Sequence, residues 1–210
     1  MHPTRLFYAT SALLALSTVA SAQATARIDT LRIQQTTRTS LDVALEGEVV
    51  LSTWSEPYTR IITTSLTQGR VHGLSNMDSR DAYALLTVDS VDVIWVRARS
   101  RVPLRTWGIS TYRESLSHEI MVPPHTSVAL TVNRGDLEIR SAPATLVATL
   151  ETGDALVRQP KDGIRLWHMT ATDGITGLGA GEAPSLTRRG AGQSVLAIEA
   201  RNGRVRVVAP

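Results

Sequence analysis

Apolar and polar residues alternate along most of this 210-residue chain. The clearest stretch is 120–139, where a run of alternating residues ends in a four-residue polar turn and the alternation then resumes. Because successive side chains of a strand point to opposite faces, this pattern predicts two half-buried strands joined by a tight turn. The alternating apolar residues are Val128, Leu130, Val132, Leu137 and Ile139.

Similar segments recur from residue 41 to the C-terminus, and they are rich in the Thr, Val, Ile and Trp that pleated sheets favour. Beyond residue 22, no window of about 11 residues or more shows the apolar period of 3.6 that is typical of an amphipathic helix. We therefore predict an all-β fold. The expected strands are 41–45, 49–51, 58–66, 83–88, 91–102, 109–112, 117–122, 127–132, 137–140, 146–150, 155–158, 164–170, 194–198 and 204–208.

The spacing of the glycine turns indicates how these strands are arranged. Their repeat of about 20 residues is the length of one coil of a solenoid, which favours a β-solenoid-like stack of short strands. Because Asp-Gly and Asn-Gly also form hairpin turns, a β-sandwich is the alternative. The Gly-rich segment 179–193 is expected to be a loop. The glycines of this repeat are Gly135, Gly153, Gly174 and Gly203, and Gly163 marks a further turn.

Residues 1–22 have the features of an export signal. Arg5 supplies a positive start, 6–19 are largely apolar, and 20–22 form a small-residue cleavage site. The apolar stretch is too short to span a bilayer comfortably. We therefore expect an exported protein, periplasmic or extracellular, with no transmembrane span after the signal is cleaved.

The rest of the chain has the size of one domain. We expect 23–40 to supply a first strand and a loose lead, and 41–210 to form a single β domain. The chain has no cysteine, so an exported domain of this sequence must depend on its own core rather than on disulfides.

The net charge of the chain argues against nucleic acid as a partner. The net charge is only +3, and arginine accounts for nearly all of the basic residues. A charge this small does not produce a strong long-range field, so we do not expect nucleic-acid binding.

Arginine and tryptophan form a stripe on one predicted strand. Trp95, Arg97, Arg99 and Arg101 occupy alternate positions, with mostly apolar residues between them. Period two places all four side chains on one face. Guanidinium groups bind carboxylate, sulfate or phosphate, and a neighbouring tryptophan can stack on a sugar.

Arg204 and Arg206 alternate with valines in the same way near the C-terminus. Together with the stripe they are our candidate binding residues for an anionic envelope glycan or a surface or membrane protein. The plainer interpretation is an exposed face that protects an edge strand from pairing.

Other polar motifs are better explained by structure than by chemistry. His118 lacks the second histidine that a zinc-protease motif requires, and His118 and His125 flank a Pro-Pro bend, which predicts turn and surface positions. The tripeptide Arg-Gly-Asp at 134–136 is associated with integrin binding, but a glycine turn with a locally bonded aspartate explains it. We therefore expect no catalytic residues, no metal and no cofactor.

Several short motifs resemble a known family. Ile120-Met121-Val122-Pro123, the alternation that follows and Gly135-Asp136-Leu137-Glu138-Ile139 resemble the head domain of candidate autotransporter adhesins and related envelope proteins of unknown function. The segments 45–51 and 202–207 resemble its opening and closing units, so that the likeness covers roughly residues 40–210. The resemblance implies a right-handed β-solenoid-like fold in the cell envelope, and it supplies no catalytic residues.

These inferences favour an exported, non-enzymatic envelope or surface protein that acts in adhesion or surface interaction. One alternative is an envelope-stress or signalling accessory that binds an anionic glycan or a membrane partner through the arginine stripe. A third is a polysaccharide-acting enzyme.

Overall fold

The computed structural model describes residues 24–34, 40–70, 83–89, 93–100, 111–158, 163–177 and 180–208. Regular structure in these ranges consists of strands, which confirms the all-β prediction, and none of them contains a helix able to cross a membrane. The predicted signal lies outside the described residues. The strands are β1 (Ala24–Gln34), β2 (Ser40–Leu45), β3 (Glu48–Thr53), β4 (Tyr58–Arg70), β5 (Tyr83–Asp89), β6 (Val93–Ser100), β7 (Thr111–Val122), β8 (Ser127–Val132), β9 (Leu137–Ile139), β10 (Thr145–Leu150), β11 (Ala155–Arg158), β12 (Ile164–Gly177), β13 (Ala180–Arg189), β14 (Ser194–Ala200) and β15 (Val205–Val208).

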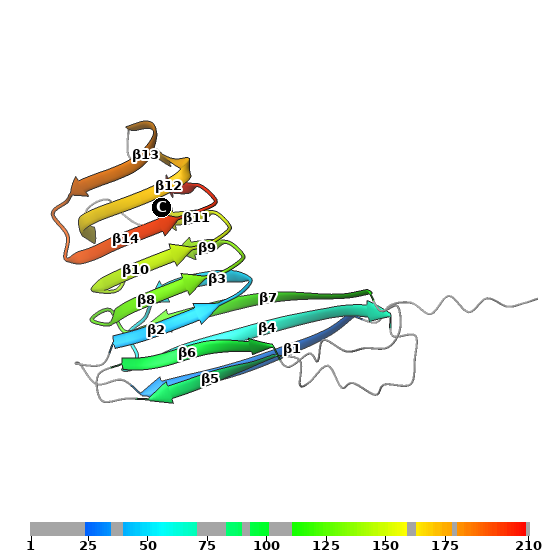
Figure 1. Ribbon diagram of the computed structural model, residues 1–210. Helices are drawn as coiled ribbons and strands as arrows, with labels where there is room; N and C mark the ends of the chain where they lie inside the picture. Colours follow the sequence, from blue (N-terminus) through cyan, green and yellow to red (C-terminus); the bar gives the residue numbers. More distant parts are fainter. Residues whose placement is uncertain are drawn as a thin grey trace, which may run out of the picture.

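Two stacks of parallel strands form the upper part of the molecule (Figure 1). The first stack contains β2, β8, β10 and β14, and the second contains β3, β9, β11 and β15. The chain passes from the first stack to the second through a short corner, for example from β8 to β9. We refer to each strand–corner–strand unit as a coil, and the coils are β2–β3, β8–β9, β10–β11 and β14–β15.

β12 closes this end of the molecule and departs from the turn expected at Asp173-Gly174. Its first part pairs with β14 and its last part with β15, so a single strand passes around the corner and extends both stacks. Gly174 has a φ of 91° and lies where the pairing register of β12 shifts. Such a bulge bends a strand without ending it, which is why no separate turn forms.

The loop expected over 179–193 is also incorrect, because β13 occupies most of it and pairs antiparallel with β12. Composition misled the prediction, since Gly and Pro are rare inside central strands but are tolerated at edges and bulges. Pro184 falls at a register shift of this edge strand, between paired residues Ala183 and Ser185. The missing N–H of proline therefore breaks no regular ladder.

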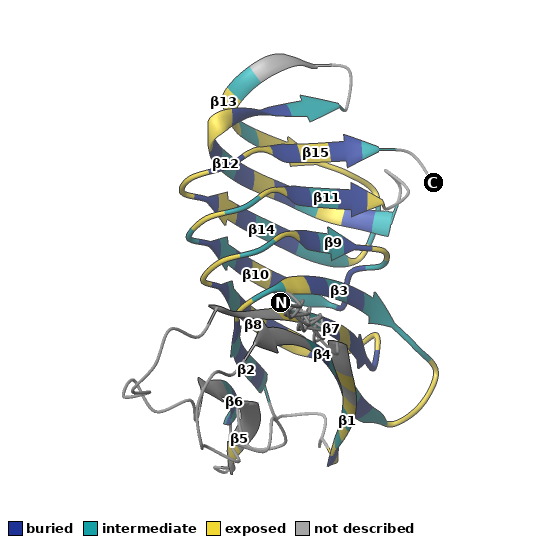
Figure 2. Cartoon of the chain, turned by 90° about the vertical axis from the view of Figure 1, so that its right-hand side faces the viewer, coloured by how far each residue is buried: buried dark blue, intermediate teal, exposed yellow. Residues whose placement is uncertain are grey.

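Alternation along each coil strand determines the core. Every second residue of β8 is buried, as predicted for Val128, Leu130 and Val132, and both Leu137 and Ile139 of β9 are buried. The inward side chains of the two stacks form one apolar cluster. Figure 2 shows the resulting alternation of buried and exposed positions along the strands.

Stacked glycines allow the corners of successive coils to approach closely. Gly135 has a φ of 131°, and a Cβ there would lie 2.0 Å from the carbonyl oxygen of Gly47 in the coil below. The same close contact joins Gly153, whose φ is 136°, to Gly135, and it also joins Gly203 to Gly153. Only glycine combines this conformation with contact between backbones.

A different arrangement lies beneath the coils, where three long strands extend to one side (Figure 1). β7 pairs in parallel with β3, whereas β4 pairs antiparallel with β7 and β1 antiparallel with β4. We refer to β1, β4 and β7 as the antiparallel extension. On the other side, β6 pairs in parallel with β2, and β5 pairs antiparallel with β6.

Candidate functional site

The outward face of the second stack carries a shallow groove. Strand pairing aligns Val50, Glu138, Leu156 and Arg206 in one row across β3, β9, β11 and β15. All four belong to the groove lining. Their strand neighbours on the other face are buried, so alternation directs these four side chains to solvent. Apolar and charged groups therefore alternate along the row.

Glu138 is the most constrained charge in the groove. Its Oε1 lies 2.8 Å from Nε of Arg158 and 3.3 Å from Nε of Arg140. The hydrogen bond from Arg140 is the main reason that the pKa of Glu138 is lowered, with further contributions from the charges of both arginines. Glu138 is therefore ionised at neutral pH, with its charge offset by two neighbours. Within the described residues, Arg206 has no comparable ion pair.

Aspartates connect the corners that border this groove. The N–H of Asp154 donates to Oδ1 of Asp136 at 2.9 Å, and the N–H of Arg204 donates to Oδ1 of Asp154 at 2.8 Å. Both aspartates and Arg204 line the groove. The predicted glycine turn at 134–136 is confirmed, but its aspartate bonds to the next coil and not to its own turn.

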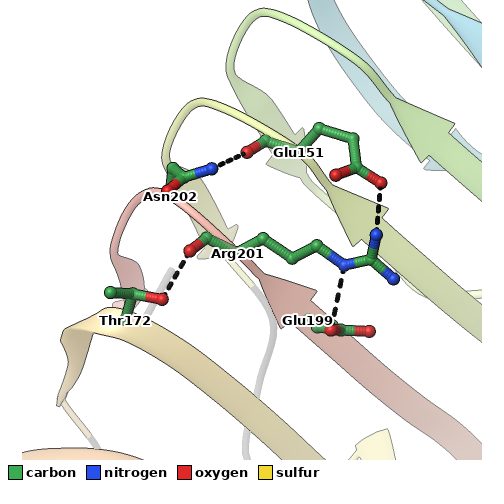
Figure 3. A network of polar contacts seen from close by, with 5 residues as sticks. All are labelled: Glu151, Thr172, Glu199, Arg201 and Asn202. Atoms are coloured by element: carbon green, nitrogen blue, oxygen red, sulfur yellow. Dashed lines mark hydrogen bonds and ion pairs between the residues drawn. The ribbon is translucent and has the colours of Figure 1, made fainter.

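A second set of polar contacts surrounds the same corners (Figure 3). Nη1 of Arg201 lies 2.7 Å from Oε1 of Glu151 in the neighbouring coil, and its Nε lies 3.1 Å from Oε1 of Glu199. The side chain of Asn202 donates to the carbonyl of Glu151 at 2.8 Å, and the hydroxyl of Thr172 donates to the carbonyl of Arg201. These groups join three neighbouring segments, so we assign them to the framework.

Of the predicted arginine stripe, Trp95, Arg97 and Arg99 belong to β6, which pairs with β2 at the end of the first stack. Ile94 and Val96 are buried while Trp95 and Arg97 are partly exposed, as alternation predicts. Arg97 forms an ion pair with Asp42 of β2, with 3.1 Å between Nη2 and Oδ2. The side chains of Arg99 and Arg101 lie outside the described residues.

The six predicted binding residues do not come together in one site. Trp95 and Arg97 belong to β6, which pairs with β2 at one end of the first stack, whereas Arg204 and Arg206 belong to the last coil in the second stack. The sequence pattern places residues on a face but does not say which strands become neighbours. Of the predicted binding residues whose side chains the structure describes, Arg204 and Arg206 line the groove, and Trp95 and Arg97 do not.

The prediction of a surface position for His118 is wrong. His118 lies within β7 and is fully buried, whereas His125 is exposed in a turn as predicted. Nδ1 of His118 is 3.0 Å from the hydroxyl of Thr63, and Nε2 is 2.9 Å from the carbonyl of Glu46. A carbonyl only accepts, so Nε2 carries the proton and Nδ1 accepts from Thr63. Burial lowers the pKa of His118, which keeps the ring neutral.

The groove on the second stack is suited to binding a partner. A partner could make ion pairs with Arg206, hydrogen bonds along the corners and apolar contacts with Val50 and Leu156. Sequence reasoning missed Val50, Glu138 and Leu156, although each is the outward residue of a recognised strand. The missing information was which outward positions of separate strands align.

No protein-family model matches the chain, and no curated protein matches it. Among solved structures, the crystal structure of a candidate cell adhesion protein from Clostridium sporogenes is similar. The sequence identity is 11% and the TM-score 0.49, over 90% of this chain and 100% of that one.

Proposed function

We propose that this protein is an exported, non-enzymatic protein of the cell envelope or cell surface that acts in adhesion or another surface interaction. The groove on the second stack carries this proposal. It presents apolar and charged side chains in an aligned row, while the nearby corner aspartates already accept backbone hydrogen bonds. Such a face binds through many weak contacts.

The framework supports the same role. Backbone groups of each corner bond to the next coil, as in the contacts of Gly135 N–H with Thr152 O at 3.0 Å and of Leu137 N–H with Asp154 O at 2.9 Å. A binding face on regular strands loses little conformational entropy when a partner docks. Export is expected from the N-terminal signal and does not depend on this geometry.

Adhesion of protein-coated beads tests the groove. Beads carrying the chain from residue 23 onward would be applied to immobilised bacterial envelopes and to a panel of polysaccharides. We expect retention that falls at least about tenfold in the double variant Leu156→Glu, Arg206→Glu. The matched control is Val147→Glu, because Val147 is an exposed apolar residue on the neighbouring strand of the same coil, β10, in the opposite stack.

Three results would contradict the proposal. The parent could fail to bind every surface, the groove variant could bind as well as the control, or the parent could cleave a polysaccharide of the panel. Export has a separate check, in which the full chain is expressed in a bacterial host. We expect to recover it from the periplasm with Gln23 as its first residue.

A further inference from the structure

A compact group of arginines and aromatic rings lies on the antiparallel extension and on the connection that leads into it from β3. Arg60 of β4 is placed over the ring of Trp54, with 4.6 Å from its guanidinium carbon to the ring centroid. Arg32 of β1 is similarly placed over Tyr58 at 5.6 Å. The two rings meet edge to face, with centroids 4.8 Å apart. We refer to these four residues as the Arg–aromatic cluster.

Local structure orders the cluster. The indole N–H of Trp54 donates to the carbonyl of Tyr58 at 2.8 Å, which ties the β3–β4 connection to the start of β4. Thr59 and Ile61 of β4 are fully buried, so Tyr58 and Arg60 lie on the opposite, outward face of the sheet. The cluster is therefore assembled before any ligand arrives.

Two features of Arg32 and Arg60 destabilise the folded protein when no ligand is bound. Arg32 and Arg60 are directly opposite each other in the β1–β4 pairing, and like charges in that relation destabilise a sheet. Among the described residues, no carboxylate forms an ion pair with either of them. The acidic residue nearest in register on this face is Glu119, which pairs with Ile62 and makes no ion pair with Arg60.

The hydrogen bonding of Arg60 is also incomplete. Its Nη2 donates to the sulfur of Met121 at 3.1 Å, a weak acceptor, and its buried Nε has no hydrogen-bond partner. A buried donor without an acceptor destabilises the folded state. A bound oxyanion would relieve the repulsion between the two arginines.

We propose that the Arg–aromatic cluster binds a carboxylate or sulfate group of an acidic polysaccharide. The planar forks of Arg32 and Arg60 match the oxygens of such a group. The partly exposed rings of Trp54 and Tyr58 offer apolar surface to the C–H groups of the attached sugar. The four residues of this site do not line the groove, and the proposal does not depend on the function proposed for the groove.

Calorimetric titration at low salt tests the site. The probes are oligogalacturonate, dextran sulfate, neutral dextran and sodium sulfate. We expect the parent to bind the two acidic polymers, more weakly as salt rises, and not neutral dextran. Arg60→Lys keeps the charge but loses the fork, and should weaken binding about tenfold or more. Arg32→Gln should weaken it as well, and because Arg32 is exposed this variant is expected to fold even if the first does not.

Controls separate this site from other arginines and from a general effect of added negative charge. Arg189→Gln removes an exposed arginine at the far end of the molecule, and Val147→Glu adds an exposed carboxylate to the first stack. Both should bind the acidic polymers as the parent does. Absence of binding by the parent, or equal binding by all variants, would overturn the proposal. Sodium sulfate that binds as tightly as the polymers would overturn the assignment to a polysaccharide.

Discussion

The coils and the antiparallel extension place their polar groups in opposite ways. Among the described residues, the buried polar side chains are Thr59, Thr63, Ser65, His118 and Thr126, and only Thr126 lies outside β4 and β7. The coil strands direct apolar residues inward, and their corners satisfy backbone groups by bonding to the next coil. The extension instead buries hydroxyls and a histidine within the sheet and gathers arginines and aromatic rings on its outward face.

This difference shows two ways in which one sheet can carry function. Each parallel coil repeats the same strand–corner–strand structure, so the outward face of the coils is regular. The binding groove therefore depends on how the outward residues of neighbouring strands align. The extension has no such repeat, and individual contacts determine its geometry. We therefore expect the coils to respond most to backbone changes and the extension to changes in single polar groups.

The largest effect should come from breaking the coil corners. Gly135→Val places a branched side chain where φ is 131° and where even a Cβ would overlap the carbonyl of Gly47. Strain of this backbone conformation and overpacking each cost about 1–3 kcal/mol, so we expect a loss of about 3–5 kcal/mol in the free energy of unfolding. Urea unfolding followed by circular dichroism measures it.

Arg134→Ala is the matched control for the corner, because Arg134 is exposed in the same turn. Its effect should be within about 0.5 kcal/mol. If both variants unfolded at the same urea concentration as the parent, the close contact between corners would not contribute to stability.

An intermediate effect should come from the histidine of the extension. Burial lowers the pKa of His118 below 6.5 in the folded state, so the unfolded chain takes up the proton first as pH falls. The contribution of His118 is complete above pH 6.5 and is lost as pH falls below it toward the folded-state pKa. We expect the melting temperature of the parent to fall between pH 7 and pH 5.

His118→Gln should remove most of that pH dependence and, at pH 7, should cost about 1–3 kcal/mol through lost buried hydrogen bonds. His125→Gln, at an exposed histidine, should leave the pH dependence unchanged. A steep fall in melting temperature that persists in His118→Gln would assign the titration to another group.

The smallest loss of stability should come from changes to the arginine stripe that begins on β6. Arg97 forms an ion pair with Asp42 in which the side chains are 43% and 33% exposed, and such pairs contribute about 0–1 kcal/mol. Replacing Arg97, Arg99 and Arg101 by Ser should therefore leave the fold intact, with a loss of at most about 1 kcal/mol in thermal unfolding. A larger loss would mean that these arginines stabilise the core.

The same triple variant tests the binding hypothesis for the stripe. Unchanged retention on an anionic polysaccharide would favour the plainer interpretation, in which the arginines protect a strand near the sheet edge. Loss of salt-sensitive retention would favour a ligand site on β6 in addition to the Arg–aromatic cluster.

Local sequence by itself determined the class of the fold, most strand positions and the burial of residues such as Leu130 and Ile139. These predictions succeeded because alternation along a strand depends only on local sequence. One face of each strand meets the apolar core and the other meets water, so the two faces need different residues. The positive φ of Gly135 was also predictable, because the turn required a residue without a side chain.

Only the tertiary structure decided which strands became neighbours. The last coil, β14–β15, inserts between the β10–β11 coil and β12, which precedes it in sequence. That order separates Arg206 from Arg97 and aligns it with Leu156 and Glu138. In the same way, the pairing of β7 between β3 and β4 places His118 in a buried position. Pairing between strands depends on backbone groups that every residue shares, so the identity of the side chains says little about the partner strand. The binding surfaces of this protein consist of such pairings, which is why they emerged only from the assembled sheet.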